Sequence, residues 1–206
     1  LIQATNTSEN SSNNTQSIYL TGNNTGTAVN ILGKNISLIA SNIGIDTDAA
    51  GISTYGTVSL GNESTDHISI SSSSENKDAK SILINGSGSV VLLSKKIATT
   101  SQAKNYAYGV TNNKSNSSVS ILGHENTDSI SINAKSNGDA YGITSLSKDA
   151  SYILNGKLID ITTSANKKSI TINLEKIKNF TTDGDILNIT ASTQYQNAIG
   201  IEAISG

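Results

Sequence analysis

The most regular feature of this sequence is the alternation of aliphatic and polar residues in short runs. Ile-Ser-Ile occurs at 68–70 and 130–132, and comparable runs recur along the chain from Ser17 onward. Strict alternation over a few residues predicts a β-strand with one buried face. Only the stretch LEKIKNF at 174–180 could suggest a helix, and its flanks alternate as strands do. The pattern therefore predicts an all-β chain.

One of these strands belongs to a motif that occurs twice. Residues 60–70 read LGNESTDHISI and residues 122–132 read LGHENTDSISI, so eight of eleven positions are identical at a distance of 62 residues. Each copy joins a turn, rich in Gly, Asn, Asp, Ser and Thr, to a strand. A strand that returns at a fixed distance indicates a repeat architecture.

Three series of aliphatic positions recur with a period near 30 residues. The first series, in which a small residue precedes the aliphatic one, is Ile52, Ile82, Val110, Ile143, Ile170 and Ile201. The second, which usually ends in Leu-Gly or Leu-Asn, is Leu32, Leu60, Leu92, Leu122, Leu154 and Leu187. The third contains the Ile-Ser-Ile runs and ends near Ile39, Ile70, Ile97, Ile132, Ile161 and Ile189.

Three series in a fixed order, with one period, describe a coil with three faces. A single coil cannot bury a core, but coils stacked about 4.8 Å apart align their aliphatic side chains into ladders. We therefore predict a parallel β-solenoid of about six three-strand coils, each of roughly 30 residues. A β-sandwich is the alternative, although it would not produce a constant period. The recurring small residue, as at Gly51 and Gly109, predicts a tight corner.

The domain organisation follows from the same pattern. We expect residues 1–16, which are almost all polar, to form an N-terminal segment or a partial coil. Residues 17–206 are expected to form a single solenoid that is a fragment of a longer protein.

Composition and charge narrow the classes of function. The chain has no Cys, Pro, Met or Trp, and all fourteen of its basic residues are Lys. Without Cys there are no disulfides and no thiolate chemistry, and the lack of Pro suits strands whose N–H groups are all paired. The net charge is −2 and no basic block occurs, so we expect no nucleic-acid partner. No apolar run approaches about 18 residues, so we expect no direct insertion into a membrane.

Residue types that carry catalysis or bind metals are present but are not grouped. His67 and His124 occupy different positions of the twin motif, so they do not make a repeated ligand set. The Asp-x-Asp pairs at 46–48 and 183–185 are too few for a calcium site of six or more oxygens, and we interpret them as turn residues. No nucleophile elbow or phosphate loop occurs, and no acid pair is selected for glycoside cleavage. We expect no cofactor, no metal and no enzymatic activity.

Recognition on a rigid scaffold is usually carried by loops. Two polar stretches, 71–78 and 111–118, are the expected contact loops. The candidate binding residues are Asn76, Lys77, Asn112 and Lys114 in these stretches, and the tyrosines Tyr106, Tyr108 and Tyr141. Exposed tyrosines could stack on sugars or serve a protein interface, or they could simply cover the end of the core. Asn-x-Ser/Thr is frequent, and in a chain this rich in Asn and Ser it arises by chance.

Several short strands of this chain occur in a style typical of one family. They are ISI at 68–70, ILG at 121–123, ILNG at 153–156, and the AYGV and AYGI runs at 107–110 and 140–143. With them, and with its cysteine-free composition, the chain resembles a passenger domain of bacterial type V autotransporter adhesins, or a haemagglutinin-like adhesin.

The resemblance implies a right-handed parallel β-helix on the bacterial cell surface, outside the outer membrane. Its expected task is adhesion or aggregation in virulence, with a host cell-surface protein, a glycan or copies of itself as partner. The alternative is a β-helix domain that binds or cleaves polysaccharide, as tailspikes and lyases do. The absence of Arg argues against cleavage of acidic sugars.

Overall fold

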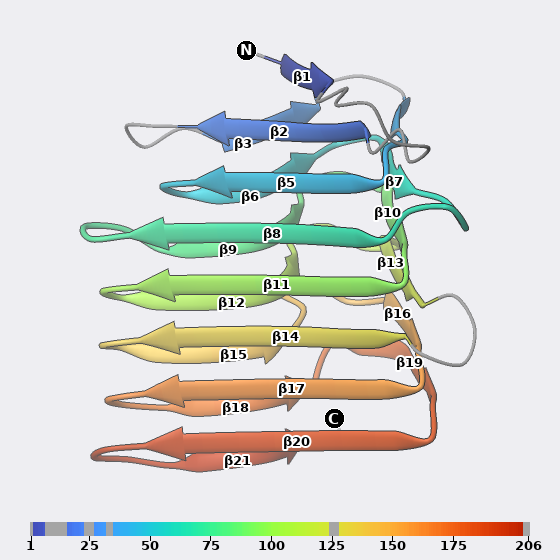
Figure 1. Ribbon diagram of the computed structural model, residues 1–206. Coiled ribbons are helices and arrows are strands. Elements are labelled where there is room, and N and C mark those ends of the chain that lie inside the picture. The colour runs from blue at the N-terminus through green and yellow to red at the C-terminus, as the bar shows by residue number, and fades with distance from the viewer. Residues whose placement is uncertain (1, 7–15, 23–26, 32–34, 124–127, 204–206) are drawn as a thin grey trace.

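The computed structural model describes residues 2–6, 16–22, 27–31, 35–123 and 128–203. All regular structure within these residues is β. Figure 1 shows the strands stacked in layers as a β-solenoid of about six turns. The stretch 174–180 contains no helix, because strand β19 (Ile177–Asp183) begins inside it. No helix in the described part of the chain is long and apolar enough to cross a membrane.

The strands form three sheets, one on each face of the coil. The 8-stranded sheet contains β1 (Ile2–Asn6), β2 (Gln16–Gly22), β5 (Asn42–Thr47), β8 (His67–Ser74), β11 (Lys96–Ala103), β14 (Ser129–Ser136), β17 (Leu158–Ala165) and β20 (Ile186–Thr193). The 7-stranded sheet contains β3 (Thr27–Ile31), β6 (Ala50–Thr54), β9 (Ala79–Ile84), β12 (Tyr106–Asn112), β15 (Asp139–Ile143), β18 (Ser169–Asn173) and β21 (Ala198–Glu202). The 6-stranded sheet contains β4 (Asn35–Leu38), β7 (Thr57–Gly61), β10 (Ser89–Leu93), β13 (Ser118–Leu122), β16 (Ala150–Asn155) and β19.

Neighbouring strands of each sheet come from successive coils and pair in parallel, which confirms the predicted three-faced solenoid. The single antiparallel pair among the described strands joins β1 to β2. Strand β1 lies in the polar segment 1–16 and covers the first edge of the 8-stranded sheet. At the other end of that sheet, β20 has no further strand beside it in the part of the chain that the structure describes.

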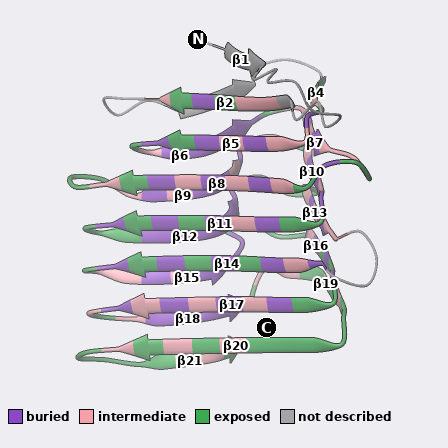
Figure 2. Ribbon diagram, in the orientation of Figure 1, coloured by how far each residue is buried: buried purple, intermediate pink, exposed green. Residues whose placement is uncertain are grey.

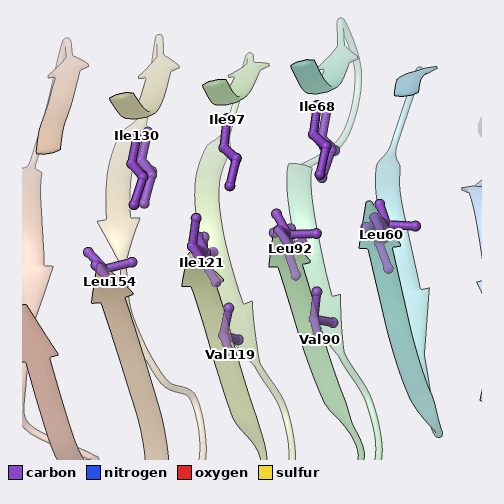
Figure 3. Packing of buried hydrophobic residues seen from close by; sticks show 14 of the residues in the cluster. Leu60, Ile68, Val90, Leu92, Ile97, Val119, Ile121, Ile130 and Leu154 are labelled. Atoms are coloured by element: carbon purple, nitrogen blue, oxygen red, sulfur yellow. The ribbon is translucent and has the colours of Figure 1, made fainter. Parts of the chain in front are cut away.

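The core consists of aliphatic ladders that run from coil to coil. Ile68 pairs with Ile97, and Ile97 with Ile130, so these side chains form one row. Figure 3 shows this row beside the row of the 6-stranded sheet, Leu60, Leu92, Ile121 and Leu154. Their side chains are almost entirely buried. Figure 2 shows that buried residues alternate with less buried ones along the strands, as the sequence pattern predicts.

The first predicted series is correct except at one position. Ile52, Ile82, Val110 and Ile143 are aligned in register in the 7-stranded sheet. The next rung is Ile172 and not Ile170. Ile143 pairs with Ile172, whereas Ile170 pairs with Tyr141, which lies two residues before Ile143 in β15. The prediction failed because SITI offers the pattern of a small residue before an aliphatic one twice in succession. Ile201 completes the ladder.

The third series is wrong at two rungs. Ile39 is 57% exposed and follows β4, while Ile45 occupies the rung that pairs with Ile70. Ile97 lies in the neighbouring row, and the rung between Ile70 and Ile132 is Thr99. Both errors select an aliphatic residue that lies elsewhere in the same coil, because spacing alone does not identify the strand or the rung.

The second series contains errors of a different kind. Leu122 lies one residue beyond the true rung, Ile121, and a shift of one residue in a strand moves the side chain to the other face. Leu187 lies in β20 of the 8-stranded sheet, and Thr182 of β19 takes the position assigned to it. Leu32 lies outside the described residues.

The predicted tight corner is a close contact between two sheets. A Cβ atom on Gly109 would lie 2.5 Å from Cγ2 of Ile132 and 2.6 Å from the carbonyl oxygen of Gly142. Gly51 makes the equivalent approach to Ile70. At these coils only glycine lets the isoleucine ladder of the 8-stranded sheet reach the backbone of the 7-stranded sheet.

The ladders predict a sharp contrast between two isoleucines that the sequence pattern treats as equivalent. Ile132→Ala should lower the free energy of unfolding by about 2–5 kcal/mol, because it leaves a cavity in a buried rung. Ile39→Ala should change it by less than about 0.5 kcal/mol, because that side chain is exposed. Urea unfolding of both variants measures the difference, and equal losses would contradict the register given above.

Candidate binding surface

Short turns join the 8-stranded sheet to the 7-stranded sheet at one edge of the rod (Figure 1). Asn76 and Lys77 lie in the turn between β8 and β9, and Tyr106 opens β12 directly after the next turn. Tyr108 and Tyr141 follow in β12 and β15 and are paired in register. Five of the seven predicted binding residues are thus placed along the same row of turns.

The three tyrosines form a stacked group, which we call the tyrosine row. The ring centroids of Tyr108 and Tyr141 are 5.3 Å apart with an interplanar angle of 10°, and those of Tyr106 and Tyr108 are 6.3 Å apart. The Nζ atom of Lys80 lies 5.4 Å from the centroid of the Tyr108 ring. Because its neighbours cover it, Tyr108 is only 9% exposed, whereas Tyr106 is 44% exposed. Tyr106 is therefore the member most available to a partner.

The surroundings of Tyr108 and Tyr141 raise the pKa of both phenol groups. Burial raises the pKa of Tyr108 well above its ordinary value, and the nearby carboxylate of Asp78 adds to this effect. Burial also raises the pKa of Tyr141 to about 12, with Asp139 the next contributor. These two hydroxyl groups therefore keep their protons, and can donate hydrogen bonds, to a higher pH than an exposed tyrosine does.

A hollow of about 460 Å³ lies beside the tyrosine row, and we call it the loop hollow. Its lining is Ala49, Ala50, Asn76, Lys77, Asp78, Lys80, Leu83 and Asn105. Lys80 pairs with Asp78 at 3.5 Å, and Asn105 directly precedes Tyr106 in the chain. Amide, ammonium and carboxylate groups therefore meet at the end of the tyrosine row. Such a set suits a partner rich in hydroxyl or peptide groups.

The other two predicted binding residues, Asn112 and Lys114, lie toward the opposite end of β12. Asn112 is fully buried, and its Nδ2 atom donates to the carbonyl oxygen of Lys114 at 2.7 Å and to Oγ of Ser117. The hydroxyl of buried Tyr152 donates to the Thr144 carbonyl at 2.7 Å and lies 3.3 Å from Oδ1 of Asn112. Asn112 therefore holds the turn from inside. The expectation of a contact loop over 111–118 is wrong at Thr111 and Asn112, which end β12 and are fully buried.

The turn of the twin motif has a structural role that its sequence only suggested. It connects the 6-stranded sheet to the 8-stranded sheet, between β7 and β8 and again between β13 and β14. In the first copy, Oγ1 of Thr65 donates to the Ala40 carbonyl at 2.8 Å and accepts from the N–H of Asn62 at 3.0 Å. Gly61 has a φ of 79°, which favours glycine. His124, in the second copy, lies outside the described residues.

The remaining candidate metal ligands that the structure describes are not assembled into a metal centre. His67 opens β8, and Asp46 lies in the neighbouring strand β5. Asp183 and Asp185 line a hollow of about 220 Å³ together with Lys157. No group of three or more His, Asp or Glu side chains that could hold a metal ion occurs within the described ranges.

The buried tyrosines predict that the protein loses stability at alkaline pH. Unfolded tyrosines ionise near pH 10, whereas Tyr141 holds its proton to about pH 12 and buried Tyr152 also has a raised pKa. The stabilisation that these groups contribute is fully present below pH 10 and is lost as the pH rises toward 12. Urea unfolding between pH 8 and 12 should show this loss, and Tyr141→Phe should reduce it. An unfolding free energy that stays constant over this range would contradict the assignment.

The absence of a metal requirement remains a prediction with a direct test. Treatment with EDTA should leave the melting temperature unchanged within error. A fall of several degrees that added calcium reverses would identify the Asp-x-Asp pairs at 46–48 or 183–185 as ligands.

Comparison with known protein families, curated proteins and solved structures gives no match for this chain. The resemblance to adhesin passengers thus depends on strand pattern and composition. The β-solenoid fold itself is a finding of the structure.

Proposed function

We propose that this solenoid is an adhesive rod displayed on a bacterial cell surface. Its partner is a host cell-surface protein or glycan, or further copies of the rod, and it attaches or aggregates cells. The surface pattern of the 8-stranded sheet is the observation that best supports this role.

Polar side chains on the outside of the 8-stranded sheet repeat in register from coil to coil. One row is Asp46, Ser71, Thr100, Asn133, Thr162 and Thr190. A second row, two residues further along each strand, is Ser73, Gln102, Lys135, Ser164 and Ser192. Hydroxyl, amide and charged groups therefore recur about every 4.8 Å along the rod.

Such rows favour many weak contacts over one strong contact. Each hydrogen bond to a partner contributes on the order of 1 kcal/mol, because it replaces a bond to water. A partner with its own repeated groups, such as a polysaccharide or a second rod, can engage several of them together. Display of many copies then multiplies the effect by avidity, so the affinity of one site need not be high.

We further propose the tyrosine row and the loop hollow as the main contact site. Tyr106 is the exposed ring of the row, and Asn76 and Lys77 contribute polar groups to the hollow next to it. Rings that stack on one another have covered faces, so a sugar ring has access chiefly to Tyr106. This geometry favours hydrogen bonding from the surrounding groups over extensive stacking on sugar rings.

A polysaccharide-binding domain is the second candidate, because the loop hollow has the polar lining that a glycan requires. A polysaccharide-cleaving domain would in addition need two carboxyl groups across a cleft. A glycan array run beside a polysaccharide-cleavage screen separates these candidates from adhesion to protein.

Substitutions in the row of turns before β9 and β12, compared with one in the loop after β12, test the contact site. Beads coated with the protein should attach to cells or clump, and the variant Tyr106→Ala with Lys77→Ala should lose most of this attachment. Lys114→Ala, which changes a lysine in the loop at the other end of the strand, is the matched control and should attach normally. Melting temperatures should confirm that all variants are folded.

The isolated protein should be monomeric at micromolar concentration, because its contacts act through avidity. If the Tyr106 and Lys77 double variant attaches as well as the unchanged protein, the contact lies on the polar rows instead. A tight stoichiometric dimer in sedimentation would contradict the avidity mechanism.

A further inference from the structure

Asparagine followed directly by glycine occurs three times in this chain, at 85–86, 137–138 and 155–156. Such a pair can change its own covalent structure in water. Glycine has no side chain to keep its backbone nitrogen away from the amide group of the preceding asparagine. The three pairs share this chemistry, so the surroundings of each pair determine whether it reacts in the folded protein.

The reaction is an intramolecular deamidation. The backbone nitrogen of the glycine loses its proton and forms a bond to Cγ of the asparagine, the bond from Cγ to Nδ2 breaks, and ammonia leaves. A succinimide ring remains. One water molecule then opens the ring, at the Cγ carbonyl to give aspartate or at the main-chain carbonyl to give isoaspartate. The reaction therefore needs a free side-chain amide, a glycine N–H that can be released, and access to water.

The surroundings of Asn137 meet these conditions. Asn137 and Gly138 form the whole turn between β14 and β15, and the Asn137 side chain is exposed (Figure 1). This side chain makes no hydrogen bond within the described residues. The N–H of Gly138 donates to the side-chain hydroxyl of Ser136 at 2.9 Å, and a rotation of that side chain releases it. A Cβ atom at residue 138 would lie 2.0 Å from the carbonyl oxygen of Asn105, so the turn requires the glycine that makes the pair reactive.

Asn85 is held through its side chain. Its Nδ2 atom donates to Oγ of Ser53 at 2.7 Å, and its Oδ1 atom accepts from Nδ2 of Asn113 at 2.9 Å. These partners belong to the coils before and after that of Asn85. Attack by the following nitrogen would require both hydrogen bonds to break, so this amide is protected in the folded protein.

Asn155 is held through the main chain. The N–H of Gly156 donates to the carbonyl of Asp183 at 3.0 Å, and the carbonyl of Asn155 accepts from the N–H of Gly123 at 2.6 Å. Both polar groups of the peptide bond between Asn155 and Gly156 are therefore paired with backbone groups. The attacking nitrogen cannot turn toward the side chain without breaking these bonds.

We propose that Asn137 is a site of spontaneous deamidation, at which aspartate or isoaspartate forms in the folded protein without an enzyme. The other two pairs keep their amides as long as the protein is folded. This inference goes beyond the proposed adhesive role and does not depend on it.

The product alters a polar hollow and the turn beside it. Asn137 lines a hollow of about 500 Å³ together with Lys104, Lys135 and Glu75, and deamidation adds a negative charge there. The backbone N–H groups of Asn137 and Asp139 donate to carbonyls of the preceding coil at 3.1 and 2.9 Å. Isoaspartate adds one carbon atom to the main chain between these two groups, so it changes the fit of the turn on its neighbour.

Mass spectrometry of the full chain tests the proposal. Trypsin places the three pairs in separate peptides, 81–95, 136–148 and 149–157, each with a single asparagine. After incubation of the folded protein at pH 8, peptide 136–148 should have lost its amide at least about fivefold faster than either of the others, because their pairs must first break hydrogen bonds. In urea, where these bonds are absent, the three peptides should lose their amides at similar rates.

Two variants connect the reaction to the geometry. Asn137→Gln is the control, because its longer side chain would have to close a larger ring, and it should stop the loss in peptide 136–148 alone. Ser136→Ala should speed the loss in that peptide, because it frees the N–H of Gly138. Circular dichroism should confirm that both variants are folded.

Two results would overturn the proposal. One is an equal or faster loss at Asn85 or Asn155 in the folded protein. The other is no loss at Asn137 during an incubation in which the chain in urea loses its amides. Cell attachment does not enter these measurements, so failure of the adhesive role is distinguishable.

Discussion

Parallel hydrogen bonding between coils, at a spacing of about 4.8 Å, is the constraint on which the rest of this structure depends. It places equivalent residues of successive coils on top of one another, so every feature becomes a row. Aliphatic rows make the core, polar rows cover the 8-stranded sheet, and the tyrosines stack on the outside.

The amino-acid pattern was sufficient to predict the architecture but not each rung. Strand alternation and the 30-residue period predicted three faces and parallel stacking, since both follow directly from the coil. The choice between Ile170 and Ile172, or between Ile39 and Ile45, depends on where each turn ends. Turn lengths differ between coils, and only the three-dimensional register assigns such neighbours to a row.

The candidate site was predictable to a similar degree. Tyrosines at equivalent positions in AYGV and AYGI had to stack once the coils were aligned, and Tyr108 and Tyr141 do so. Asn112 could not be assigned from sequence, because asparagine is common both in exposed loops and as an internal support for a turn.

The direction of the hydrogen bonds between coils has a mechanical consequence. These hydrogen bonds run along the axis of the rod. A force that pulls the two ends of the rod apart therefore stretches the bonds of all three sheets between two neighbouring coils at the same time. A force on a side turn, such as the one between β8 and β9, instead opens the bonds of its coil one after another. The rod is therefore strong in tension along its axis and weak to peeling from its side. Under the proposed function, a cell held through the side turns would be released by unzipping of single coils, while the rest of the rod stays folded.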